Sequence, residues 1–468
     1  MRKRILALAT CLMMGLTNTT AFAYTAEVCQ GNTPDVQDVL VFQNKLGAKY
    51  GRGNVSLKGY SNGRITIADS TDFANAKNYD VLYWSSHGGH WGDEAVLNIT
   101  ENDSKAFNTF PMAENWKNTS KLKVAILGSC YQFDGNVLRG KWADIMKNSG
   151  LKVLAGYHDK SPTTGVDTNI ANEFFRLANE TTSSSQGNSV RYAWQQANIA
   201  NGASAKWIVL GYKTNRLEYY RLPGFPGSFD ATPSSKTVYR YTSKNIDGTD
   251  ATAPASFIDG DMPYKIEVSR DKLAINPEVL NSQYETMPLS DDPSAKMIYI
   301  RENTVDPIDA ESVKQNNASV IVDLGLESSL MDAAVSNYAL LETEILDDGM
   351  DGSENTIGMV TTYQQNFRGI PLENNFFTVC SDKEGVFSVI NRWSDIGESE
   401  TTDSIMYGIS DAKAKLPQTL GGDSSAIDNA QYIYKKAEDG TYRLSVKMIT
   451  ENNQQYYMDT ATGEISEN

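Results

Sequence analysis

The chain has 468 residues, and 58 Asp and Glu against 42 Lys and Arg give it a formal net charge of −16. An acidic chain of this kind lacks the clustered positive charge that binding to nucleic-acid phosphates requires, so no nucleic-acid partner is expected. Its length corresponds to about two to four domains, each large enough to bury a core. Four cysteines are too few for a disulfide framework.

The first 23 residues have the pattern of a secretory signal peptide. Three basic residues near the start precede an apolar run from Ile5 to Leu16, and residues 21–23 (Ala-Phe-Ala) fit the small-residue rule for cleavage. The apolar run is too short to span a bilayer, and no later segment is long and apolar enough. We therefore expect residues 1–23 to be removed and the protein to be secreted or associated with the cell surface. A lipid anchor on Cys11 is the lesser alternative.

Residues 24–222 alternate between short apolar runs and segments with helical spacing of apolar residues. This alternation is typical of a mostly parallel sheet flanked by helices, that is, of the α/β class. The predicted strands cover residues 79–84, 122–127, 151–157 and 206–210, and the predicted helices cover residues 36–46, 142–146, 170–178 and 189–200. On such a sheet, catalytic groups lie in loops at the carboxyl ends of the strands.

A segment rich in Pro and Gly, from Leu222 to Pro233, predicts a domain boundary. Beyond it there is no His, and several short runs alternate apolar with polar residues, as half-buried antiparallel strands do. These runs are residues 264–268, 296–300, 376–379, 386–390 and 442–448. We expect an α/β domain at 24–230, a linker or β-rich accessory region at 236–330 and an α+β region at 331–468.

Two of the predicted strands end in residues suited to nucleophilic catalysis. One ends in His87 and Gly88, and another ends at Cys130, 43 residues after His87 (130 − 87). That separation allows a helical crossover between neighbouring parallel strands, which would bring an imidazole and a thiol to the same edge of the sheet. The imidazole promotes ionisation of the thiol and can later protonate the leaving group. The backbone N–H groups of Gly88 and Cys130 are expected to form an oxyanion hole.

Other interpretations of these residues stay open. A Cys after an apolar strand is commonly a small buried hydrophobic residue, and the chain would then be an inactive scaffold or binding protein. Alternatively, His87, His90, Asp93 and Cys130 could bind zinc, although the glycines between the histidines suit a substrate loop better. We predict no metal and no other cofactor. His158 follows the next strand, and we expect His90 and His158 to contact the substrate.

Three cysteines follow the predicted signal peptide: Cys29, Cys130 and Cys380. In an oxidising compartment an odd number leaves at least one thiol unpaired or paired between chains. A Cys29–Cys380 disulfide would leave Cys130 free, but a disulfide needs close Cα atoms, which the sequence does not show.

The two strand-end blocks together resemble the caspase, legumain, gingipain and clostripain group of cysteine peptidases. In that group a His-Gly pair follows one hydrophobic strand, and the catalytic Cys follows a second. His87-Gly88 matches the first block and residues 128–130 (Gly-Ser-Cys) match the second, within a resemblance over about residues 60–222. It implies a caspase-like fold and a secreted cysteine endopeptidase with Cys130 as nucleophile and His87 as acid–base partner. Residues 128–132 differ from the caspase Gln-Ala-Cys-x-Gly, so a preference for Asp is not implied.

The C-terminal region carries two further resemblances. Residues 362–371, which end in Gly-Ile-Pro, resemble a segment of the propeptide module of thermolysin-type proteases. Residues 456–465 resemble the closing hairpin of a PepSY-type module, and residues 411–415 would belong to the helix before it. Such modules resemble inhibitors or folding chaperones in cis, which implies an intramolecular restraint on activity, as in a zymogen. The alternative is an accessory domain that binds a surface or a partner. The acidic turn at 347–352 lacks the EF-hand glutamate, so calcium is not expected.

Overall fold

A computed structural model describes the chain between Tyr24 and Glu467, with gaps. The described residues are 24–33, 35–99, 105–119, 121–162, 165–179, 187–201, 206–245, 285–309, 335–347, 350–351, 355–367, 370–394, 401–402, 405–419, 427–437, 439–450 and 455–467. The predicted signal peptide, the predicted strand at 264–268 and the side chains of the acidic turn lie outside them. Within these ranges no helix has the length and apolar character needed to cross a membrane.

Five parallel strands form the centre of the N-terminal part. Their pairing gives the order β2, β1, β5, β9, β10, and every pair is parallel. The strands are β1 (Ala26–Gln30), β2 (Val55–Lys58), β5 (Val81–Ser85), β9 (Val124–Gly128) and β10 (Val153–Tyr157). The α/β class with a mostly parallel central sheet is thereby confirmed. The sequence did not predict β1, because the buried polar residues Glu27 and Gln30 interrupt its apolar pattern.

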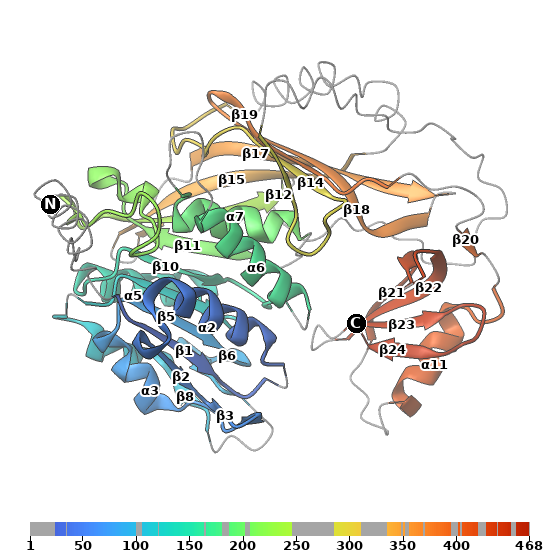
Figure 1. The fold of residues 1–468 in the computed structure, drawn as a ribbon, viewed down its shortest axis with the longest axis horizontal. Helices are drawn as coiled ribbons and strands as arrows, with labels where there is room; N and C mark the ends of the chain where they lie inside the picture. The colour runs from blue at the N-terminus through green and yellow to red at the C-terminus, as the bar shows by residue number, and fades with distance from the viewer. Residues whose placement is uncertain are drawn as a thin grey trace, which may run out of the picture.

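Helices cover both faces of this sheet, as successive side chains of β5 show. Tyr83 stacks on Phe42 of α2 with ring centroids 3.5 Å apart, whereas Trp84 packs against Phe73 of α3 with centroids 5.3 Å apart. Successive strand residues point to opposite faces, so α2 and α3 lie on opposite sides. α6 and α7 join the α2 side, and α4 and α5 join the α3 side. The helices are α2 (Gln37–Tyr50), α3 (Ser70–Asn75), α4 (Thr109–Ala113), α5 (Gly135–Lys147), α6 (Val166–Asn179) and α7 (Val190–Ala200) (Figure 1).

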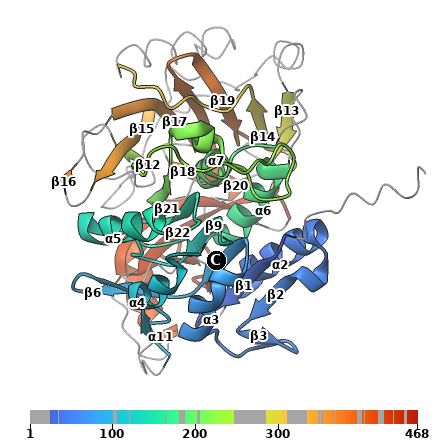
Figure 2. The same ribbon diagram turned by 90° about the vertical axis from the view of Figure 1, so that its left-hand side faces the viewer.

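The sheet continues beyond the α/β part as antiparallel strands. β11 (Trp207–Gly211) pairs with β10 and with β12 (Val238–Asn245), and β12 also pairs with β15. From β15 the pairing runs through β17, β18, β19, β14 and β13. Their bounds are β13 (Glu285–Pro288), β14 (Lys296–Tyr299), β15 (Val335–Asp347), β17 (Asn355–Phe367), β18 (Ile370–Asp382) and β19 (Gly385–Asn391). Both views place these strands above the α/β part (Figures 1 and 2).

Buried polar contacts fasten the antiparallel strands to α7. The Nε of Arg392 donates to the carbonyl oxygen of Ala200 at 2.7 Å, and the Oγ of Ser388 donates to the Oε1 of Gln196 at 3.0 Å. All four residues are buried. Hydrogen bonds between buried groups are strong in a low-dielectric interior, so these contacts fix the extension against the helices of the α/β part.

A second, smaller hydrophobic core lies in the C-terminal module, which begins near residue 401, and includes Ile370 and Leu372 at the start of β18. Its strands pair in the order β21, β22, β23, β24, all antiparallel, and α11 packs against β21 and β22. The elements are β20 (Thr401–Thr402), α11 (Ile409–Thr419), β21 (Ile427–Lys436), β22 (Tyr442–Thr450), β23 (Gln455–Asp459) and β24 (Ile465–Glu467). The Asp459 carboxylate accepts the N–H groups of Ala461 and Thr462 in the turn. The predicted helix around 411–415 and the closing hairpin are therefore present.

Glu27 makes the stability of the sheet depend on pH. Burial in β1 raises the pKa of Glu27 to about 8, although the charge of Lys58 opposes the shift. The unfolded chain releases this proton above its ordinary pKa of 4.5, whereas the folded chain keeps it up to about pH 8. The contribution of Glu27 to stability therefore falls as the pH rises from 4.5 to 8.

Glu27→Gln is expected to remove this pH dependence. Its free energy of unfolding should exceed that of wild type by a margin that grows from about zero near pH 4.5 to a few kcal/mol near pH 8. Urea unfolding at several pH values measures the margin, and Glu464→Gln, at an exposed position, is the control. A constant margin across this range would contradict the prediction.

Candidate active site

His87 and Cys130 lie at equivalent positions past the ends of two adjacent strands. β5 and β9 pair in parallel with a constant offset, since Ser85 lies opposite Gly128 (128 − 85 = 43). His87 and Cys130 have the same offset (130 − 87 = 43), and each lies two residues beyond this last pair. Adjacent strands are about 4.8 Å apart, so the imidazole and the thiol start from neighbouring backbone positions at one edge of the sheet. The predicted crossover between parallel strands is confirmed.

Hydrogen bonds fix the backbone immediately before these two residues. The hydroxyl oxygens of Ser86 and Ser129 lie 3.2 Å apart, and both serines are buried. The Nε1 of Trp84 donates to the Ser86 hydroxyl at 3.0 Å. The backbone N–H of His87 donates to the side-chain oxygen of Asn32, in the loop after β1, at 3.1 Å. Three adjacent strands therefore determine where the His87 loop begins.

Gly88 packs directly against the backbone of Cys130. A Cβ atom at residue 88 would lie 2.4 Å from the carbonyl oxygen of Cys130 and 3.1 Å from its nitrogen, so only glycine permits the approach. The buried Gln132 holds the same peptide, because its Nε2 donates to the Cys130 carbonyl at 3.1 Å and to the Val96 carbonyl at 3.0 Å. The loops of His87 and Cys130 are thus in van der Waals contact.

Cys130 is a free thiol on a sharp turn, and its side chain is only partly buried. The backbone N–H of Ser161 donates to its Sγ at 3.3 Å, and the Ser161 hydroxyl lies 3.2 Å from the same atom. Tyr131 has a φ of +58°, a left-handed conformation that is uncommon for a residue with a side chain and that occurs often at functional sites. The Tyr131 N–H donates to the Asp159 carbonyl at 2.8 Å, which holds the turn.

The His87 side chain is exposed, yet neighbouring protein atoms remove part of its hydration. This desolvation lowers the pKa of His87 below its ordinary value of 6.5. At neutral pH the imidazole is therefore uncharged, which is the form that accepts a proton from a thiol. A general base in this protonation state suits nucleophilic catalysis near pH 7.

His90 and His158 converge on one carboxylate. The Nε2 of His90 lies 3.5 Å from one oxygen of Asp134, and the Nε2 of His158 lies 3.7 Å from the other. Asp134 follows Cys130 by four residues and precedes α5, and the ring of His90 also packs edge-on against Tyr131. The structure therefore places both histidines beside the Cys130 turn, around Asp134. Their predicted contact with substrate stays a prediction.

The positions of the side chains bear on the proposed disulfide and on the zinc alternative. Cys29 and Cys380 are buried, unpaired thiols in β1 and β18, so the disulfide that the sequence left open is not formed. Within the described part of the chain, no three His, Cys, Asp or Glu side chains are grouped as metal ligands. The four residues of the zinc alternative, His87, His90, Asp93 and Cys130, are therefore not grouped as a ligand set there.

Four residues that the sequence analysis did not single out support this site. They are Asn32, Gln132, Asp134 and Ser161. Two of them, Gln132 and Asp134, lie two and four residues after Cys130. This closeness in sequence could have marked them as part of the site. Asn32 and Ser161 lie in loops after β1 and β10, and their role becomes visible only once the strand order is known.

The fold and the site define an α/β protein with a thiol and an imidazole at one sheet edge. A family model described as a domain of unknown function (DUF6345) matches residues 62–242, which include both strand ends. None of the curated proteins matches the chain. These residues therefore carry the functional argument by themselves.

Two solved structures are similar at a low level. The Arg-specific cysteine proteinase gingipain R aligns with a TM-score of 0.27 and 10% identity over 92% of this chain and 65% of its own. The C-terminal domain of YpeB from Bacillus megaterium aligns with a TM-score of 0.21 and 13% identity over 41% of this chain and 94% of its own. Similarities of this size carry no argument about chemistry.

Proposed function

We propose that the protein is a cysteine-type endopeptidase with a caspase-like arrangement of its catalytic residues. One observation carries the proposal: His87 and Cys130 share the 43-residue register of two adjacent parallel strands and lie at the same edge. The free, partly exposed thiol supports it, because a nucleophile must reach its substrate. The lowered pKa of His87 supports it as well.

The reaction would proceed through an acyl-enzyme. His87 accepts the thiol proton, and the Sγ of Cys130 attacks the carbonyl carbon of the scissile peptide bond. The negative charge that develops on the carbonyl oxygen would be stabilised by the N–H groups of Gly88 and Cys130. The C–N bond breaks as His87 returns the proton to the leaving amine, which leaves a thioester. Water, deprotonated by His87, then attacks the thioester and releases the carboxylic acid and the thiol.

We also propose that the enzyme acts outside the cell, because residues 1–23 read as a signal peptide. Restraint of activity by the C-terminal region belongs to the same proposal. It is supported by the α+β module at 401–467, whose closing hairpin carries the PepSY-like residues.

Hydrolysis of a mixed peptide library by wild type and by Cys130→Ala tests the proposed function. Wild type should cleave peptides, and Cys130→Ala should lose about 10³-fold or more of that activity because no acyl-enzyme forms. Cys380→Ala removes a buried thiol elsewhere and is the matched control. Equal rates for wild type and Cys130→Ala would refute the proposal.

A further inference from the structure

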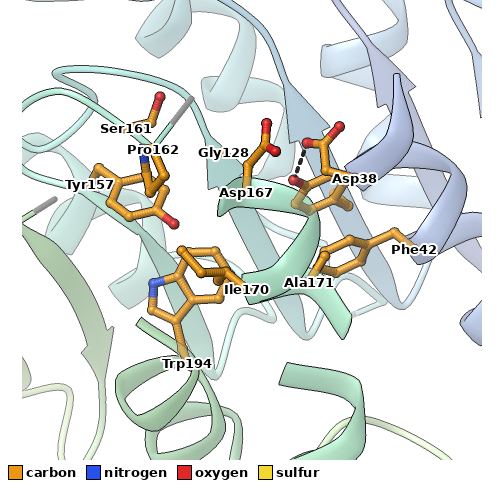
Figure 3. Close-up of a pocket in the computed structure, with 11 residues that line it drawn as sticks. Asp38, Phe42, Gly128, Tyr157, Ser161, Pro162, Asp167, Ile170, Ala171 and Trp194 are labelled. Carbon is orange, nitrogen blue, oxygen red and sulfur yellow. Dashed lines mark hydrogen bonds between the residues drawn. The ribbon is translucent and has the colours of Figure 1, made fainter. Parts of the chain in front are cut away.

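The pocket beside the Cys130 turn is too small to hold a substrate side chain. It lies between α2, α6 and the sheet, and Ser161, which contacts the Sγ of Cys130, lines it together with Asp38 and Asp167 (Figure 3). Its inner part has room for about one water molecule. A peptide at the thiol is therefore held by the open surface around His87 and Cys130.

Two exposed apolar side chains lie on the segments that follow the proposed catalytic residues. Within the described ranges the exposed large apolar residues are Ile65, Trp91, Val137, Ile405 and Met406. Trp91 follows His87 by four residues, and Val137 follows Cys130 by seven. Each exposes 50% of its surface. Single apolar residues on a surface are ordinary, whereas grouped ones indicate a binding site, so the position of these two relative to each other matters.

A hairpin and α5 bring Trp91 and Val137 to the same surface. The hairpin consists of β6 (Gly88–Trp91) and β7 (Glu94–Leu97). Trp91 lies directly opposite Glu94, so the two side chains project to the same side of the hairpin. The Oε1 of Glu94 accepts a hydrogen bond from the Nζ of Lys141 on α5 at 2.6 Å. Val137 precedes Lys141 by four residues, so both lie on the helix face that meets the hairpin.

Two further contacts place the hairpin along the first two turns of α5. The Nε2 of His90 lies 3.5 Å from Asp134, just before the helix, and the Nζ of Lys141 donates to the carbonyl oxygen of Asp93 at 2.7 Å. The helical stretch from Asp134 to Lys141 is about 10 Å long. The extended stretch from His90 to Asp93 has about the same length. The two exposed apolar residues fall within these stretches and therefore border the same groove line.

β6 also offers a backbone edge for an extended peptide. In the part of the chain that the structure describes, its sheet has the order β6, β7, β8 (Phe107–Asn108), which makes β6 an edge strand. An edge strand directs backbone N–H and C=O groups outward and can pair with an extended peptide. β6 begins at Gly88, which packs against the backbone of Cys130. A peptide paired with β6 would therefore run from the thiol toward Trp91.

The side of His87 is the side of the leaving group. In the proposed reaction His87 returns a proton to the leaving amine, so this amine must lie within reach of the imidazole. β6 begins one residue after His87. The residues that follow the scissile bond would therefore meet β6 first and then the apolar side chains of Trp91 and Val137.

We propose that β6 and the start of α5 bind the part of the peptide substrate that follows the scissile bond, and that Trp91 and Val137 hold a large apolar side chain within its first three residues. The inference rests on the proposed peptidase function. A leucine or phenylalanine side chain suits this surface, because contact with the indole ring removes apolar area of both partners from water.

Peptides that differ at one of the first three residues after the scissile bond test the inference. At one of these positions leucine should give a kcat/KM about 10-fold or more above asparagine, which has nearly the same shape. Trp91→Ala should reduce this ratio to below about 2 and leave the unfolding midpoint nearly unchanged, because the side chain is half exposed. Met406→Ala, which removes an exposed apolar side chain of the C-terminal module, should leave the ratio unchanged.

A binding measurement separates this surface from the chemistry. Trileucine amide, which imitates the leaving part of a substrate, should bind Cys130→Ala saturably in an NMR titration. Triasparagine amide should bind at least about 10-fold more weakly, and adding Trp91→Ala should abolish the difference.

The outcomes distinguish the two proposals. Binding of trileucine amide that depends on Trp91, without any peptide cleavage, would retain the surface and refute the peptidase. Cleavage without a preference for leucine after the scissile bond would retain the peptidase and overturn the inference. Equal binding of the two amides would overturn it as well, and so would a Trp91-dependent preference that lies before the scissile bond.

Discussion

His87→Ala is expected to lower kcat/KM for peptide hydrolysis by about 10²–10⁴-fold, because the thiol then lacks its proton acceptor and the leaving amine lacks its proton donor. The side chain is exposed, so its removal should leave the unfolding midpoint nearly unchanged. Steady-state kinetics and the rate of Cys130 alkylation measure the effect. His90→Ala and His158→Ala, whose rings contact Asp134, are the matched controls and should lose less than about 10-fold.

The pH dependence of kcat/KM is a second test of His87 as the base. Desolvation lowers the pKa of His87 below 6.5, so the uncharged imidazole persists into mildly acidic solution. The acidic limb of kcat/KM for wild type should therefore have its midpoint below pH 6.5, with activity rising as the pH increases through it. If His87→Ala retains both the rate and this limb, then His87 is not the base.

Gly88→Ala is expected to damage the site and the fold together. The new Cβ would lie 2.4 Å from the Cys130 carbonyl oxygen and 2.9 Å from the Nε2 of Gln132. Both groups are held by hydrogen bonds, so the Cys130 turn must move, which should cost about 1–3 kcal/mol of stability. Activity should fall more than about 10-fold, because a displacement near 1 Å at the nucleophile is enough for such losses. Urea unfolding and steady-state kinetics measure the two effects.

Gly140→Ala is the matched control for this substitution. Gly140 lies inside α5, and a Cβ there would meet nothing within 4 Å. Alanine should therefore stabilise the helix by up to about 1 kcal/mol and leave activity unchanged. Wild-type activity in Gly88→Ala would contradict the close packing of the two loops.

The central part of the fold could be predicted because its signals are local. Residues 81–85 and 124–128 are short apolar runs, and a spacing of 43 residues between them suffices for a helical crossover. The equal register of His87 and Cys130 then follows from the pairing of their strands. The placement of His87 and Cys130 at one sheet edge could therefore be predicted before the other strands of the sheet were known.

The remaining parts depend on contacts between distant segments. β1 carries buried Glu27 and Gln30, so hydrophobic patterning does not mark it, and Asn32 after β1 could not be linked to His87. Asp38 and Asp167 are 129 residues apart (167 − 38) and share a pocket only because α2 and α6 pack on the same face of the sheet. The restraining role of the C-terminal region stays a prediction.

β12 pairs with a strand on each side, so a fragment that ends after β12 would lack one of its partner strands. β12 joins β11 of the α/β part to β15 of the antiparallel part. A fragment that ends at Asn245 would leave a row of backbone N–H and C=O groups without partners along that strand. Exposed strand edges of this kind recruit other chains and lead to aggregation. The accessory strands thus cover a strand edge that the α/β part would otherwise leave open.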